Sequence, residues 1–224
     1  MCRVPARAPN VLTDTLPKPQ RFLARMMGMT ATVLVLPGGK PNSLQRARPW
    51  HLSSVRMRPF TSAIREAGAD SGIHVVQVQY QVRGWNRGGS SAITDVRRVM
   101  ADVRRERPGA PIVLVGHSMG GRVAAHLAAE PDVLGVVALA PWWPGGEGYL
   151  FRSAQHLAVL HGTADRWTSP DASRREVVAA SRRGVRASWT PVENAGHFML
   201  RHPARWHAWV CEEALRIASL APSQ

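Results

Sequence analysis

With 224 residues, 45% of them hydrophobic and 20% charged, the chain is long and apolar enough for one domain with a sizeable core, and this composition excludes a disordered protein. No apolar run reaches 18 residues, so the sequence predicts no transmembrane segment. The formal net charge is +14, but all of the 29 basic side chains except Lys18 and Lys40 are arginine and no nucleic-acid-binding motif is present, so we attribute the charge to a general arginine bias and expect no nucleic-acid partner.

Residues 1–29 differ in composition from the rest of the chain. They are basic and rich in proline and lack the apolar stretch of a secretory signal, which predicts a flexible leader. The two cysteines, Cys2 and Cys211, are too few for a disulfide framework and indicate a reducing, cytoplasmic location. Residues 30–220 are expected to form a single domain, and its oligomeric state is left open.

Short apolar runs alternate with longer amphipathic segments from residue 30 onward, the pattern of parallel βαβ units. Strands are predicted at 32–37, 73–80, 111–117, 133–141, 156–162 and 186–192. Helices are predicted at 53–68, 91–107, 119–130, 171–183 and 202–219. The sequence therefore predicts an α/β fold with a mostly parallel six-stranded sheet and helices on both faces.

The crossover connections of such a fold bring the carboxyl ends of all strands to one edge of the sheet, where open α/β folds bind ligands. Residues directly after strands are therefore the candidates for function. The interval 141–155 is too short for an inserted lid, so no large cap domain is expected over this edge.

The third predicted strand ends in the sequence GHSMG, residues 116–120, which has the GxSxG pattern of a nucleophile elbow. The flanking glycines let the strand and the following helix approach closely, while the serine takes strained backbone angles. The turn lifts the Ser118 hydroxyl above the sheet edge at a helix amino terminus. There the Met119 N–H and the helix dipole can stabilise a developing oxyanion.

A serine becomes nucleophilic only beside a base that takes its proton and a third group that orients the base. Asp165 follows the fifth predicted strand and His197 follows the sixth, so both are expected at the same sheet edge as Ser118. Asp171 is the main rival of Asp165, but it stands where an aspartate commonly caps a helix. Activity should fall as the pH is lowered and the base becomes protonated.

With these residues in this order, the chain resembles a small α/β-hydrolase over about residues 31–210. The resemblance implies an α/β-hydrolase fold and a catalytic triad of Ser118, Asp165 and His197. It also implies that a second oxyanion N–H comes from the loop LPGGKPNS, with Gly39 favoured and Lys40 a close alternative.

Aromatic side chains are the candidates for an acyl-binding wall. Trp142 and Trp143 directly follow the fourth predicted strand, and Phe198 follows the expected base; Met119 and Trp167 could join them. For Trp143 a place at the end of the core is an equal alternative. Separately, the cationic groups of Lys40, Arg83 and Arg87 follow strands at this edge and could attract an anionic acyl or phosphate group, although solvated loop charges are the commoner case.

Together these features predict a serine hydrolase that cleaves acyl esters through an acyl-enzyme. No metal site and no cofactor are expected, and the expected partner is a small-molecule acyl ester. The same three residues would also serve a thioesterase, an acyltransferase or another α/β-hydrolase chemistry, because the fold hosts many reactions. A non-catalytic relative that binds a small ligand or a protein is the alternative from another class.

Overall fold

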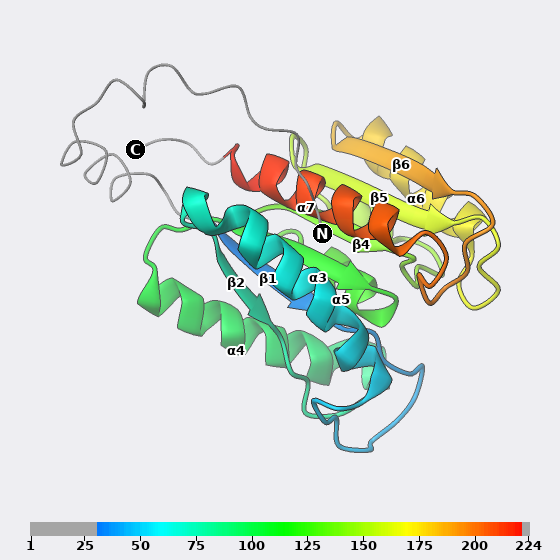
Figure 1. Cartoon of the computed structure of the whole chain (residues 1–224), viewed down its shortest axis with the longest axis horizontal. Coiled ribbons are helices and arrows are strands. Elements are labelled where there is room, and N and C mark those ends of the chain that lie inside the picture. The colour runs from blue at the N-terminus through cyan, green and yellow to red at the C-terminus, as the bar shows by residue number, and fades with distance from the viewer. Residues whose placement is uncertain (1–30, 221–224) are drawn as a thin grey trace.

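The computed structural model describes residues 31–220, and the predicted leader, residues 1–29, lies outside them (Figure 1). Six strands form one sheet, in the order β2-β1-β3-β4-β5-β6, and every neighbouring pair is parallel. The strands are β1 (Thr32–Leu36), β2 (His74–Gln77), β3 (Ile112–His117), β4 (Val133–Leu139), β5 (His156–Gly162) and β6 (Arg186–Val192). The predicted α/β fold is confirmed, with a wholly parallel sheet.

Helices cover both faces of this sheet. They are α3 (Leu52–Gly68), α4 (Ser90–Glu106), α5 (Met119–Leu127), α6 (Pro170–Arg182) and α7 (Pro203–Ala218), with the 3-10 turns η1 (Ala69–Ser71), η2 (Asn86–Gly89) and η3 (Glu147–Leu150). Helices α3 and α7 lie side by side on one face (Figure 1), and α4, α5 and α6 pack on the other. A parallel sheet covered in this way must be apolar on both faces.

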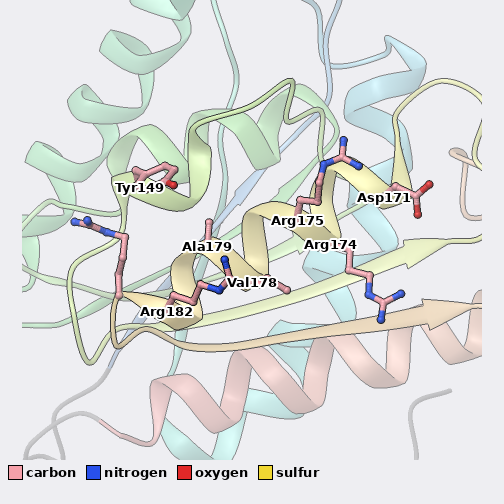
Figure 2. A pocket seen from close by; sticks show the side chains of 8 residues that line it. Tyr149, Asp171, Arg174, Arg175, Val178, Ala179 and Arg182 are labelled. Carbon is pink, nitrogen blue, oxygen red and sulfur yellow. The ribbon is translucent and has the colours of Figure 1, made fainter.

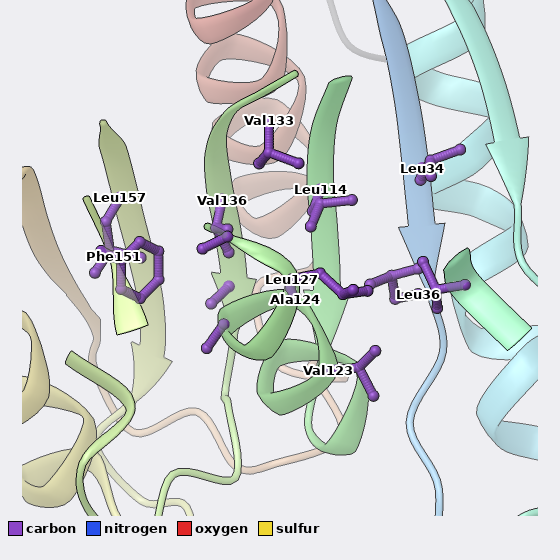
Figure 3. Close-up of a cluster of buried hydrophobic side chains, with 14 of the residues drawn as sticks. Leu34, Leu36, Leu114, Val123, Ala124, Leu127, Val133, Val136, Phe151 and Leu157 are labelled. Atoms are coloured by element: carbon purple, nitrogen blue, oxygen red, sulfur yellow. The ribbon is translucent and has the colours of Figure 1, made fainter. Parts of the chain in front are cut away.

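Strand β1 shows how the sequence meets that requirement. Its side chains alternate between the two core clusters: Leu34 and Leu36 join the cluster under α4, α5 and α6, whereas Val33 and Val35 join the cluster under α3 and α7. Figure 3 shows the first of these clusters, with Leu36 close to Leu127 of α5. A continuous run of aliphatic residues therefore marks a strand buried on both faces.

Strand β2 is shorter than the predicted segment 73–80 and ends at Gln77. The apolar alternation continues beyond it, because Val78 and Tyr80 are buried, but the chain then pairs with the loop that follows β1. The backbone O of residue 81 accepts from the Ala47 N–H at 2.8 Å, and the N–H of residue 81 donates to the buried carboxylate of Asp95 at 2.8 Å. Hydrogen bonding to a loop rather than to a strand explains the early end.

Strand β1 pairs with β2 on one side and with β3 on the other, so the strand order reverses between β1 and β3. Ligands of open α/β sheets bind in the crevice at such a switch point. Leu36 at the end of β1 lies opposite Gly116 near the end of β3. The loops after these two strands therefore meet at this point.

The segment between β4 and β5 carries only the short turn η3, so within residues 31–220 no large cap covers the sheet edge. Among the residues that the structure describes, no helix is both long and apolar enough to cross a membrane.

Candidate functional site

Ser118 stands in the sharp turn between β3 and α5. Its backbone angles, φ 55° and ψ −117°, lie in a region that residues other than glycine rarely occupy. A Cβ at Gly116 would overlap the backbone of Gly120, and a Cβ at Gly120 would overlap the carbonyl of Leu36. Both glycines are therefore needed for the close approach of strand and helix that holds Ser118 in this strained position.

The loop after β1 runs beside this turn. A Cβ at Gly38 would lie 3.4 Å from Ser118 Cβ, and a Cβ at Gly39 would overlap the side chain of Met119. The Lys40 N–H donates to Arg83 O at 2.8 Å, whereas no hydrogen bond within the described residues uses the Gly39 N–H. Of the two predicted candidates for the second oxyanion donor, only the Gly39 N–H is thus left without an acceptor.

Ser118, His197 and Asp165 form one hydrogen-bonded line. His197 Nε2 lies 3.0 Å from Ser118 Oγ, and His197 Nδ1 lies 2.8 Å from Asp165 Oδ2. His197 and Asp165 are both buried. Because a carboxylate accepts only, His197 donates from Nδ1, and its Nε2 is left to accept the serine proton.

The carboxylate of Asp165 collects further donors that the sequence did not suggest. The Thr168 hydroxyl donates to Oδ2 at 2.8 Å, and the backbone N–H groups of Trp167 and Thr168 donate to Oδ1 at 2.8 and 3.0 Å. Burial alone would raise the pKa of Asp165, but hydrogen bonds from His161, His197 and the Thr168 N–H outweigh it and hold the pKa well below its usual range. The group therefore stays ionised.

Two further histidines, His161 and His117, stabilise this arrangement: one contacts Asp165 and the other contacts the backbone of His197. His161 Nε2 lies 3.1 Å from Asp165 Oδ2, the same oxygen that His197 contacts, and burial lowers the pKa of His161. His117 Nε2 donates to the backbone O of His197 at 3.0 Å. Burial, reinforced by neighbouring positive charges, lowers the pKa of His117 to about 3, so its ring is neutral near pH 7.

A cavity of about 470 Å³ opens beside Ser118. Its lining includes predicted site residues from four segments: Gly39, Lys40, Ser118, Met119, Trp142, His197 and Phe198. Trp143, which the sequence predicts as a possible part of the acyl-binding wall, does not line the cavity. It is 2% exposed, donates its indole N–H to Gly121 O at 3.1 Å and packs against Phe151 in the core. Of the two tryptophans, only Trp142 lines the cavity.

Trp142 is held in place by a partly buried cation. The Arg122 guanidinium lies over the Trp142 ring at 4.8 Å and over the Trp85 ring at 4.6 Å, and it pairs with the buried carboxylate of Glu147 at 2.9 Å. Cation–π contacts strengthen when the cation is partly removed from water. Arg122 therefore fixes one wall of the cavity.

Other candidates lie elsewhere. Asp171 sits in the first turn of α6, and the cap of that helix is Ser169, which accepts from the Ala172 N–H at 3.1 Å. Arg83 and Arg87 are not lining residues of the cavity, whereas Arg56 of α3 is, and the sequence pattern did not single it out. Arg56 lies on a helix and not directly after a strand, so the rule that selects residues after strand ends does not find it.

A second cavity of about 530 Å³ runs along α6, away from Ser118. Arginines dominate its lining, and in Figure 2 the side chains of Arg174 and Arg175 point to opposite sides of the helix. It contains no serine, cysteine or histidine. Although it is the larger cavity, it lacks the groups for nucleophilic chemistry.

Comparisons with known proteins agree with this architecture. Residues 33–191 match the model of the alpha/beta hydrolase family. No curated protein sequence matches.

Solved structures with the same fold include a serine hydrolase without a lid from Xanthomonas campestris, at 21% identity, covering 87% of this chain and 84% of the other with a TM-score of 0.64. A propionate-bound esterase from Thermogutta terrifontis has 20% identity, coverage of 87% and 86% and a TM-score of 0.64. A serine hydrolase homologue from Coxiella burnetii has 17% identity, coverage of 83% and 85% and a TM-score of 0.62. At these identities the likeness shows the fold alone.

Proposed function

We propose that this chain, which belongs to the alpha/beta hydrolase family, is a serine hydrolase that cleaves acyl esters through an acyl-enzyme. The observation that carries the proposal is the line of two hydrogen bonds, 3.0 Å from Ser118 to His197 and 2.8 Å from His197 to Asp165. A binding protein would have no need for these three groups in this order.

In the first half of the reaction, Ser118 Oγ attacks the ester carbonyl carbon while His197 Nε2 takes the hydroxyl proton. Asp165 holds the ring with Nδ1–H toward the carboxylate and stabilises the positive charge that forms on it. Collapse of the tetrahedral intermediate breaks the bond to the alcohol oxygen, which receives the proton from His197. The acyl group is then bound to Ser118.

The negative charge of the tetrahedral intermediate needs hydrogen-bond donors that are in place before the reaction. The N–H of Met119, the first residue of α5, has no acceptor within its helix, and the Gly39 N–H is unused. We assign these two groups to the oxyanion hole, with Lys40 excluded because its N–H is bonded to Arg83 O.

In the second half, a water molecule gives a proton to His197 and attacks the acyl carbon, which releases the acid and restores Ser118. The residues that the structure describes form no cap over the cavity, so water can reach the acyl-enzyme. Its size and the wall at Trp142 suit a short to medium acyl group, and the relative from T. terrifontis is an esterase with bound propionate.

The test is the intact mass of the protein after incubation with a serine-directed fluorophosphonate, together with turnover of 4-nitrophenyl esters of increasing acyl length. We expect one label on Ser118 and hydrolysis of the shorter esters. Ser118→Ala should lose the label and about a millionfold in turnover while keeping its fold. Ser53→Ala is the matched control, because Ser53 lines the same cavity and should leave labelling intact.

Labelling without release of acid from any ester would favour transfer to another acceptor, and thioesters and added alcohols would then be assayed. A folded protein that neither labels nor turns over would contradict the proposal and favour a binding role.

A further inference from the structure

We infer that the cavity beside Ser118 selects esters that carry a negative charge, a carboxylate or phosphate group bound by Arg56 and Lys40. This inference rests on the proposed hydrolysis at Ser118 and adds the class of substrate. Both cations line the cavity, Arg56 from α3 and Lys40 from the loop after β1.

The charges of the cavity wall are all of one sign. Its lining holds no aspartate or glutamate, and of its two histidines His117 is neutral near pH 7. The carboxylate of Asp165 lies behind His197 and Thr168 and is held by their hydrogen bonds, so the two cations of the lining favour an anionic group beside the reactive serine.

Arg56 is a half-buried cation without a counter-charge. Its guanidinium donates to the backbone O of Phe198 and lies 4.5 Å from the Phe198 ring, but no carboxylate among the described residues lies within salt-bridge distance. Burial lowers the pKa of Arg56, because partial removal from water disfavours the charged form of the guanidinium. A guanidinium has five N–H donors, so several remain for an anionic ligand.

Six arginines of the described residues form ion pairs with carboxylates, and Arg56 is not one of them. Ion pairs of this kind join Arg97 with Glu130, Arg98 with Asp95, Arg104 with Asp132, Arg105 with Asp102, Arg122 with Glu147 and Arg216 with Glu213. Other arginines of the described residues also form no ion pair, and Arg56 differs from them in lining the cavity of the nucleophile.

Lys40 is exposed at the same cavity, on a backbone that is fixed on both sides. Its N–H donates to Arg83 O at 2.8 Å, and its O accepts from the Trp85 N–H at 2.9 Å. The side chain is free of ion pairs among the described residues and can move toward a ligand. We expect Lys40 to contribute less than Arg56, because water screens an exposed charge.

Arg56 could instead serve only to hold the Phe198 segment, or to stabilise the oxyanion. Either role would affect charged and neutral esters equally, whereas recognition of an anion changes the ratio between them. The experiment therefore uses matched pairs that differ in one charge: mono-4-nitrophenyl adipate with its methyl ester, and 4-acetoxybenzoate with its methyl ester. The first pair places the charge on the acyl group and the second on the leaving group.

For the wild type we expect a higher kcat/KM for the charged member of at least one pair, after correction for its rate of hydrolysis by hydroxide. Arg56→Gln should lower this ratio about tenfold or more through KM, and Lys40→Gln about threefold. Raising NaCl to about 0.5 M should lower the rate for the charged ester only. Arg58→Gln is the control, since Arg58 lies on the same helix but donates to Pro49 O outside the cavity.

Equal rates for charged and neutral esters, or a ratio that Arg56→Gln leaves unchanged, would overturn this inference and leave the proposed hydrolysis standing. Absence of both labelling and turnover would overturn the proposed function and this inference with it.

Discussion

Replacing Thr168 by valine removes one hydroxyl group from the centre of the candidate site and changes little else. The hydroxyl is buried, donates to Asp165 Oδ2 at 2.8 Å and lies 3.2 Å from His197 Nδ1. The backbone N–H of residue 168, which donates to Asp165 Oδ1 at 3.0 Å, is kept in the variant. The change therefore weakens the hold on the carboxylate without releasing it.

A hydrogen bond to a charged group contributes about 1.5–3 kcal/mol to stability. We expect Thr168→Val to lower the free energy of unfolding by about 2 kcal/mol near neutral pH. The carboxylate keeps donors from His197, His161 and two backbone N–H groups. His197 therefore stays oriented, and kcat/KM should fall only about tenfold, a loss of about 1.4 kcal/mol in transition-state stabilisation.

Urea unfolding followed by tryptophan fluorescence measures the first quantity, and hydrolysis of a short 4-nitrophenyl ester measures the second. Thr168→Ser is the matched control, because it keeps the hydroxyl and should recover most of both losses. Wild-type stability and activity in Thr168→Val would refute the reasoning. Equal losses in the serine and valine variants would show that the hydroxyl does not by itself account for the effect, because the serine variant keeps it.

Three further outcomes are expected. Asp165→Asn should lower kcat about 10⁴-fold with little change in KM, because the amide favours the wrong tautomer of the base; a loss below tenfold in steady-state assays would contradict this role. Gly120→Ala should lower the free energy of unfolding by about 1–3 kcal/mol in urea melts, whereas Gly196→Ala, whose Cβ would meet nothing closer than 3.9 Å, should change it little. Between pH 6.5 and about 3 the unfolded chain binds a proton at His117 that the folded chain does not, so stability should fall as the pH is lowered through this window; His117→Gln should reduce that dependence, and parallel pH profiles for the two proteins would argue against it.

Much of the fold could be predicted from local patterns. Aliphatic runs such as β1 and β3 are buried on both faces, and this requirement leaves a continuous apolar signal in the sequence. The segment after β2 was harder to predict, because its apolar alternation continues while its hydrogen bonds go to the loop at residues 40–47. Periodicity records burial and not the identity of the hydrogen-bond partner.

The sequence by itself determined the strand-to-helix turn at Ser118 and the order in which Asp165 and His197 follow later strands, because chain order and parallel crossovers bring strand ends to one edge. Only the tertiary structure decided that Trp142 and not Trp143 lines the cavity, that Thr168 holds the carboxylate, and that Arg56 of α3 lines the same cavity as the nucleophile. The cavity lining joins segments far apart in the chain, so it is set by packing and leaves no local pattern. Thr168 lies only three residues from Asp165, but its hydroxyl contact depends on how the chain turns there and not on a residue pattern.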